Sequence, residues 1–165
     1  MAREYARYLT RTHRDDDWRQ LSSLHHDAYM ALASSADISW CGVVPYVPAR
    51  YAGFSTDLST SKRVEKVWQE LADRDYLILD QTEGELLVRT FIRHDNLLAK
   101  PNLTKAMLTA YRKVRSCRII AAINGELAKL QHDLPKLSGW AVIAEQFPEL
   151  FTELFPEQFP KPFKG

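Results

Sequence analysis

Cysteine, long apolar runs and a signal peptide are the features that this sequence has least of. The 165 residues include 2 cysteines, Cys41 and Cys117, which we expect to be buried thiols and not a disulfide framework. No apolar run is long enough to cross a bilayer, and the first residues lack the apolar stretch of a signal peptide. The sequence therefore predicts no membrane contact and a cytoplasmic protein.

Catalytic and cofactor motifs are also missing. The sequence has no Gly-rich phosphate loop, no G-x-S-x-G elbow and no zinc spacing of cysteine and histidine. His25 and His26 are neighbours, so on a helix they diverge by about 100° and cannot share a metal ion. His13 with Asp15 and Asp17 has suitable ligand atoms, but a capped and solvated turn is the more common use of such a cluster. We expect neither an enzyme nor a cofactor or metal site.

An excess of one charge is absent as well. The chain has 22 Lys and Arg against 21 Asp and Glu, a net charge of +1, which by itself does not indicate a nucleic-acid partner. The charges are nevertheless segregated. Residues 100–125 contain six basic residues and no acidic one, and the first fourteen residues contain four arginines and a single glutamate. Segregation of this kind can create a basic face on a nearly neutral protein.

The sequence does contain enough apolar residues, 45% of the chain, for one packed domain. The stretch after residue 55 predicts a helix over 59–72, with Ser59 as its N-cap. The buried face of this helix has the i, i+3, i+4, i+7 spacing and comprises Val64, Val67, Trp68 and Leu71. Residues 76–80 and 86–92 predict the two strands of a hairpin. A basic-tipped helix followed at once by a hairpin is how a winged helix-turn-helix ends.

The residues before this stretch predict the remaining elements of the same domain. Residues 3–13 suit a leading strand beside the hairpin, with a helical arm as the alternative. A first helix is predicted over 22–34 and a short strand over 38–44. Pro48 can begin a brief helix that extends to residue 54, since the N–H that proline lacks has no helical partner there. Together these elements predict a mainly α fold with a small antiparallel sheet (α+β), a winged helix-turn-helix over residues 1–98.

The candidate DNA contacts cluster at the N-terminal end of the helix over 59–72 and on the short helix before it. They are Arg50, Thr60, Ser61, Lys62, Arg63 and Lys66. Lysine and arginine reach guanine edges or phosphates, and hydroxyls bond phosphates or bases, so this helix is predicted to enter the major groove. The alternative is an ordinary solvated surface, which Glu65, Glu70 and Asp73 on the same helix favour. The hairpin tip, residues 81–85, is acidic and would be repelled by phosphate, so it is predicted to be structural or to contact protein.

A long basic helix is predicted after the hairpin, over residues 99–132, with a break near Gly125 as the alternative. Apolar residues from Leu103 to Ala121 alternate in steps of four and three, as in a coiled-coil seam, and favour a homodimer through 103–121. A sector away from the centre of this seam contains Lys105, Arg112, Arg115 and Arg118. We expect these four side chains to add sequence-independent phosphate contacts, with an ordinary solvated face as the alternative.

Residues 133–165 are a Pro/Phe-rich C-terminal segment, in which a short helix over 137–147 is followed by irregular chain. The segment is predicted either to cover the apolar surface of the domain or to bind a host or phage replication protein. Residues 146–151, Gln-Phe-Pro-Glu-Leu-Phe, loosely resemble the peptides that bacterial replication proteins insert into the sliding clamp. Packing of the segment's own aromatic residues on the domain is the favoured alternative.

Several segments of the chain together resemble one family of proteins. They are Trp18-Arg19-Gln20-Leu21-Ser22, Gly42-Val43-Val44-Pro45, Arg50-Tyr51-Ala52, Val64 to Leu71, Tyr76-Leu77-Ile78-Leu79-Asp80 and Glu85 to Asp95. Over residues 3–112 the chain resembles small winged-helix proteins of actinobacterial phages and prophages, and the N-terminal domain of phage replisome-organiser and replication-initiation proteins. The resemblance implies a double-stranded DNA-binding protein that acts in phage replication or transcriptional control. It implies no separate helicase-loading domain, because the chain is shorter than the relatives that carry one.

A protein-binding function is the rival hypothesis. Many winged helices are scaffolds, and a module of this size could bind a host replication or transcription factor to inhibit or redirect it. The near-neutral charge, the acidic hairpin tip and the phenylalanine-rich C-terminal segment favour this alternative.

Overall fold

The structure is a computed structural model that describes residues 6–155. It is mainly helical with one small antiparallel sheet, as the sequence predicts. The first half of the chain forms η1 (Thr10–Arg14), α1 (Asp16–Arg19), α2 (Ser23–Ala33), β1 (Val43–Pro45), η2 (Pro48–Arg50), α3 (Ser61–Asp73), β2 (Leu77–Asp80) and β3 (Glu85–Val88). The second half forms α4 (Phe91–His94), α5 (Pro101–Tyr111), α6 (Cys117–Asp133), α7 (Gly139–Gln146) and α8 (Pro148–Leu154). Among these helices none is long and apolar enough to cross a membrane.

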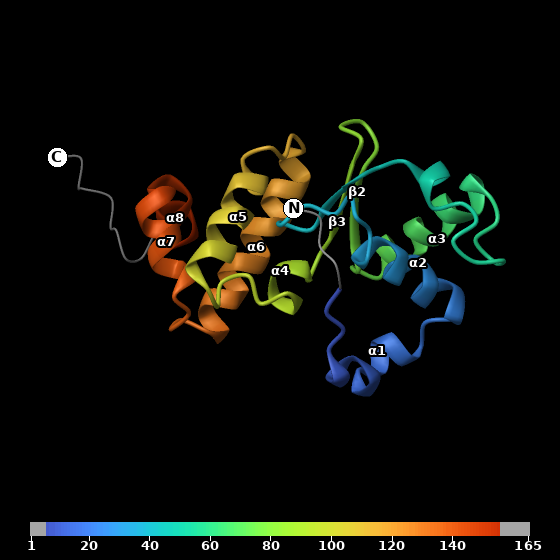
Figure 1. The fold of residues 1–165 in the computed structure, drawn as a ribbon, viewed down its shortest axis with the longest axis horizontal. Helices are drawn as coiled ribbons and strands as arrows, with labels where there is room; N and C mark the ends of the chain where they lie inside the picture. The colour runs from blue at the N-terminus through green and yellow to red at the C-terminus, as the bar shows by residue number, and fades with distance from the viewer. Residues whose placement is uncertain (1–5, 156–165) are drawn as a thin grey trace.

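The sheet lies between two groups of helices: α1, α2 and α3 on one side and α5 to α8 on the other (Figure 1). Its strand order is β1-β3-β2, and both pairings are antiparallel, with Val44 and Leu79 each opposite Leu86. All four residues of the central strand β3 are buried. A strand that is covered on both faces needs apolar residues on both, which explains why β3 shows little alternation.

One contiguous hydrophobic core runs through all three predicted segments, 1–98, 99–132 and 133–165, and extends from Trp18 to Phe155. Trp68 of α3 is fully buried, and two tyrosine rings pack edge-on against it at centroid distances of 5.4 and 5.3 Å. The three segments therefore pack as one unit over the residues that the structure describes.

Local sequence explains where the longer helices begin. Ser22 caps α2 and Thr60 caps α3, each with a side-chain oxygen that accepts a backbone N–H of the first turn. The N-cap of α3 is therefore Thr60, whereas the sequence predicted Ser59. Helices α5 and α8 begin with proline, whose missing N–H has no helical partner at that position.

Several predicted elements of the first half are different or shorter. The predicted leading strand is wrong: residues 10–14 form the 3-10 helix η1, and residues 3–5 lie outside the described part of the chain. The strand predicted over 38–44 is reduced to β1, because the N–H of Ser39 bonds the carbonyl of Val43 across a turn. The second hairpin strand stops before α4, and the brief helix predicted after Pro48 is the single 3-10 turn η2.

The predicted long basic helix is wrong, and so is the alternative break near Gly125, which lies inside α6. The chain turns instead at residues 112–116, between α5 and α6. Ser116 causes the restart, because its Oγ accepts the N–H of Ile119 at 3.1 Å and caps α6. The two helices then bury their apolar faces separately.

The predicted homodimer seam from Leu103 to Ala121 is divided by this turn and is not a continuous stripe. Met107 is fully buried in the core, whereas Cys117 and Ala121 are exposed. A coiled-coil seam needs its apolar residues along one face of one helix, so the argument for a homodimer through 103–121 does not hold. Cys117 is also an exposed free thiol, in contrast to the prediction, while Cys41 is a buried one as expected.

The C-terminal segment is helical where it is described, and the prediction of irregular chain is wrong there. Helices α7 and α8 follow each other, and Leu150 and Phe155 are buried. The ring of Phe155 packs edge-on against Trp140 at 5.9 Å. Residues 146–151, which resemble a clamp-binding peptide, are therefore part of the protein's own packing, as the favoured alternative predicted. Residues 156–165 lie outside the described part of the chain.

Candidate nucleic-acid interface

Helix α3 presents two lysines on the face that points away from the core. Its buried residues are Val64, Val67, Trp68 and Leu71. Because an α-helix turns once in about 3.6 residues, the opposite face carries Lys62, Lys66 and Gln69. Both lysines are exposed, Lys66 with 77% of its side chain accessible. These side chains project into solvent, as the sequence predicts.

The cations of α3 lie nearest its N-terminus, and its acids Glu70 and Asp73 have partners of their own, Asp73 through the amide of Gln69. The first turn contains no acidic residue. Glu70 contacts Nε2 of His25 at 2.8 Å and lies 4.0 Å from Lys66, which leaves Lys66 weakly paired. Neither Lys62 nor Arg63 has an ion-pair partner among residues 6–155. The positive end of the helix dipole coincides with these two side chains, so this end of α3 suits a polyanion.

The other residues predicted for this surface are used within the protein. Thr60 caps α3 with Oγ1 at 3.3 Å from the N–H that it accepts, and Ser61 is partly buried. Nη1 of Arg50 donates to Oδ2 of Asp37 at 2.9 Å, and this ion pair is about half exposed. The remaining cations, called the α3 basic surface below, are Lys62, Arg63 and Lys66.

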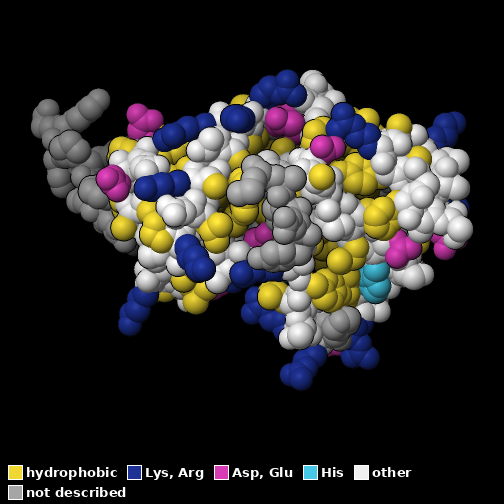
Figure 2. Space-filling model, in the orientation of Figure 1, with side chains coloured by type: hydrophobic (Ala, Val, Ile, Leu, Met, Phe, Trp, Pro, Cys, Tyr) yellow, Lys and Arg dark blue, Asp and Glu magenta, His cyan; other side chains and the backbone are white. Residues whose placement is uncertain are grey.

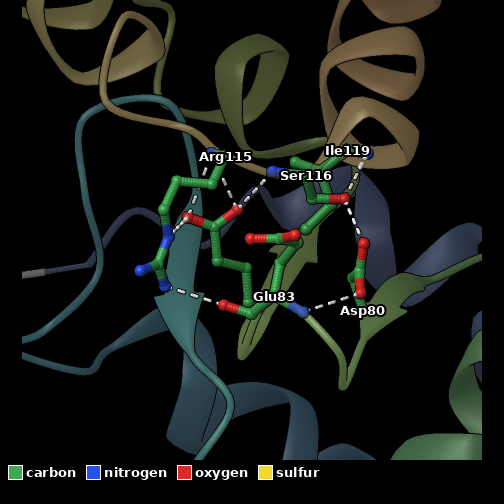
Figure 3. Close-up of polar contacts among 6 residues, drawn as sticks. Asp80, Glu83, Arg115, Ser116 and Ile119 are labelled. Carbon is green, nitrogen blue, oxygen red and sulfur yellow. Dashed lines mark hydrogen bonds and ion pairs between the residues drawn. The ribbon is translucent and has the colours of Figure 1, made fainter.

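The acidic tip of the β2–β3 hairpin is bound to the start of α6 (Figure 3). Oγ of Ser116 donates to Oδ2 of Asp80 at 2.6 Å. The other oxygen of Asp80 accepts the N–H of Glu83 at 3.1 Å. The Ser116 hydroxyl, and after it the N–H of Glu83, hold the pKa of Asp80 below its ordinary value of 3.8.

Glu85 supplies the buried carboxylate of this network. Its two oxygens accept the N–H of Arg115 at 3.1 and 3.2 Å, and one of them accepts the N–H of Ser116 at 3.0 Å. Nη2 of Arg115 donates to the carbonyl of Glu83 at 2.7 Å (Figure 3). The carboxylate therefore satisfies backbone N–H groups at the N-terminal end of a helix, where negative charge is stabilising. The acidic tip is structural, which is one of the two alternatives that the sequence left open.

The four cations predicted to form one basic sector are separated in the structure. Lys105 is exposed on α5. Arg112 donates to a backbone carbonyl at 2.7 Å, and its guanidinium lies over the ring of Phe147 at 5.0 Å. Arg118 donates to a backbone carbonyl of β2 at 3.3 Å, and Arg115 is bound to the hairpin tip. Because the chain turns between α5 and α6, these side chains do not share one helical face, and the predicted sector is wrong.

Sequence reasoning missed the residues that connect α3 to the hairpin tip. Nε2 of Gln81 donates to the hydroxyl of Tyr46 at 3.1 Å, and the ring of Tyr46 packs against Trp68. Burial raises the pKa of Tyr46, and the nearby carboxylate of Glu65 on α3 raises it further. No periodic pattern marks these contacts. Ser116 was missed as well, although a serine directly before an apolar helix is a recognisable N-cap signal.

Other features of the described residues do not indicate a site. A cavity of about 430 Å³ beneath residues 7–18 is lined by four arginines and four aspartates, a balance that selects neither sign of ligand charge. No group of His, Cys, Asp or Glu between residues 6 and 155 could hold a metal ion. No protein-family model, curated protein or solved structure matches this chain.

Proposed function

We propose that this protein binds double-stranded DNA through a winged helix-turn-helix, with α3 in the major groove. The element order α2, β1, η2, α3, β2, β3 supports this architecture, because the 3-10 helix η2 and the segment 51–60 connect to α3, and a hairpin follows α3 directly. The sheet order β1-β3-β2 agrees with it as well. The resemblance to phage winged-helix proteins supports a role in phage replication or transcriptional control.

The α3 basic surface is the observation that carries the proposal. Lys62 and Lys66 lie opposite the buried stripe of α3, with Arg63 beside them, toward the N-terminal end, which is the part of a recognition helix that contacts base edges. Lysine and arginine are the usual donors to guanine and to phosphate oxygens. Rigid support also matters for reading bases, and α3 has it, because Trp68 at its centre is fully buried between two tyrosine rings.

The test begins with selection of bound duplexes from a random-sequence library, followed by fluorescence anisotropy on the enriched duplex. The double variant Lys62→Ala/Lys66→Ala should bind about 30-fold more weakly or worse, since each good base contact contributes about 1–3 kcal/mol. The matched control is Lys129→Ala/Lys136→Ala, which removes two exposed lysines from α6 and the segment after it. The control should keep most of the affinity.

Circular dichroism should show the same helix content for both double variants, so that a loss of binding reports on contacts and not on folding. Failure to enrich any duplex would refute the proposal. So would an equal loss of affinity in the two double variants, because total charge alone would then explain binding.

A protein-binding module is the second candidate, and Phe54 is the observation that favours it. This side chain is 55% exposed in the segment that leads into α3. Phenylalanine is one of the residue types that are enriched at protein interfaces relative to the rest of the surface. The replacement Phe54→Ser should abolish capture of a partner from nuclease-treated host lysate, with the partner identified by mass spectrometry. An unchanged set of captured proteins would argue against this candidate.

A further inference from the structure

A protein that reads bases with one helix also needs phosphate contacts beside it to fix its register on the duplex. The β2–β3 hairpin tip cannot supply them. Its carboxylates are those of Asp80, Glu83 and Glu85, and phosphate would be repelled by them. Two of the three are in addition bonded to the residues at the start of α6.

The turn between α5 and α6, residues 112–116, sits on this acidic tip and carries the opposite charge. Arg115 bonds the carbonyl of Glu83 while 66% of its side chain stays exposed. Lys113 is exposed and has no ion-pair partner among residues 6–155. Figure 2 shows Lys and Arg side chains along the edge of the molecule where Figure 1 places the hairpin tip and this turn.

A chain of contacts leads from α3 to the turn. Trp68 of α3 packs against Tyr46, and the hydroxyl of Tyr46 accepts a hydrogen bond from Gln81 in the hairpin tip. The same tip holds Arg115 through the carbonyl of Glu83. The hairpin tip therefore joins α3 on one side to the α5–α6 turn on the other.

A groove gives a second, independent link. It separates β1 from α5, has a volume of about 420 Å³, and is lined by Asp37, Lys113 and Arg115 among others. Asp37 is the ion-pair partner of Arg50, which ends the short helix before α3. The α5–α6 turn thus borders this groove directly, and Arg50 is linked to the groove through its ion pair with Asp37.

We propose that the α5–α6 turn contacts the DNA backbone in place of the hairpin tip. Lys113 is the phosphate-binding residue, and Arg115 is a positioning residue that holds the turn on the hairpin and covers its negative charge. This inference rests on the proposed function. Arg112 is excluded from the contact by its stacking on Phe147, and Lys105 lies one to two helical turns away along α5.

Lys113→Ala and Lys105→Ala form a matched pair for the test, because each removes one exposed lysine without a described ion pair. Anisotropy on the selected duplex is measured over a range of salt concentrations. Each phosphate contact contributes about 0.9 to the slope of log K against log salt. Lys113→Ala should therefore lower that slope by about 0.9 and weaken binding about fivefold near 0.15 M salt. Lys105→Ala should change neither quantity, and Lys113→Arg should retain both.

The outcomes separate this inference from the proposed function. If Lys62→Ala/Lys66→Ala weakens binding while Lys113→Ala equals Lys105→Ala, the α5–α6 turn is not a contact and the role of α3 still stands. If Lys105→Ala lowers the slope more than Lys113→Ala, the backbone contact lies elsewhere on α5 and the inference is overturned. If no duplex is bound by the unaltered protein, the proposed function itself fails.

Discussion

Removal of the Glu85 carboxylate should destabilise this protein far more than removal of the Glu83 carboxylate two residues away. The Glu85 side chain is 11% exposed, and it accepts the N–H of Arg115 at 3.1 and 3.2 Å and that of Ser116 at 3.0 Å. Hydrogen bonds to a charged group contribute about 1.5–3 kcal/mol, and a buried N–H left unpaired costs about 1–3 kcal/mol. Since these terms overlap, Glu85→Ala should lower the free energy of unfolding by about 2–4 kcal/mol.

Glu83 provides the control on the same hairpin tip. It takes part in the network through its backbone: its N–H donates to Asp80, and its carbonyl accepts from Arg115. Glu83→Ala preserves both bonds, so the free energy of unfolding should change by no more than about 0.5 kcal/mol. Each substitution removes one negative charge from the tip, so a general charge effect would act equally on both.

Urea denaturation followed by circular dichroism at neutral pH measures the difference, with linear extrapolation to water. Glu85→Gln is a useful intermediate, because an amide oxygen can still accept one N–H but carries no charge. Its loss should fall between the other two. Equal destabilisation by Glu83→Ala and Glu85→Ala would refute the view that the Glu85 carboxylate holds the start of α6 through the N–H groups of Arg115 and Ser116.

Two further predictions follow from the packing and titration of other residues. A Cβ on Gly139 would lie 2.8 Å from Cα of Leu98, so Gly139→Ala should lower the free energy of unfolding by about 1–3 kcal/mol. A Cβ on Gly125 would meet open space, so Gly125→Ala should raise the free energy of unfolding by about 0.5–1 kcal/mol. Thermal unfolding compares the two variants, and equal shifts of their melting temperatures would contradict the close approach of α7 to Leu98. Because the pKa of Asp80 is held below 3.8, its contribution to stability is present above that value and is lost as the pH falls through the lower folded pKa. Unfolding free energy should therefore decline more steeply below about pH 4 in the unaltered protein than in Asp80→Asn, and parallel curves would contradict this.

Periodicity was a reliable guide where one element buries one continuous face. The stripe from Val64 to Leu71 located α3 and identified Lys62 and Lys66 as outward-facing. The same kind of pattern misled over residues 103–121. Met107 on α5 and Ile119 on α6 are both fully buried in one core, so their spacing continues smoothly across a turn that periodicity does not report.

The candidate site was predictable only in part, for a different reason. Chemical type and spacing alone placed Arg50, Lys62 and Arg118 among the candidate DNA contacts. In the structure Arg50 is paired with Asp37 and Arg118 is bonded to β2, while Lys62 has no ion pair among residues 6–155. Whether a cation is available to a ligand depends on which acceptors lie within a few ångströms of it. Those acceptors come from other parts of the chain.

By itself the sequence determined the α+β class, the place of α3 and the face of α3 that is buried. These properties depend on residues within one or two helical turns of each other, and local patterns record them. Only the tertiary structure decided that the acidic hairpin tip bonds to the start of α6 and that the chain turns at 112–116. Glu85 and Ser116 are 31 residues apart, and Asp80 and Ser116 are 36 apart. A contact over that separation leaves no periodic trace, because it is set by how the helices pack against the sheet and not by the spacing of neighbouring side chains.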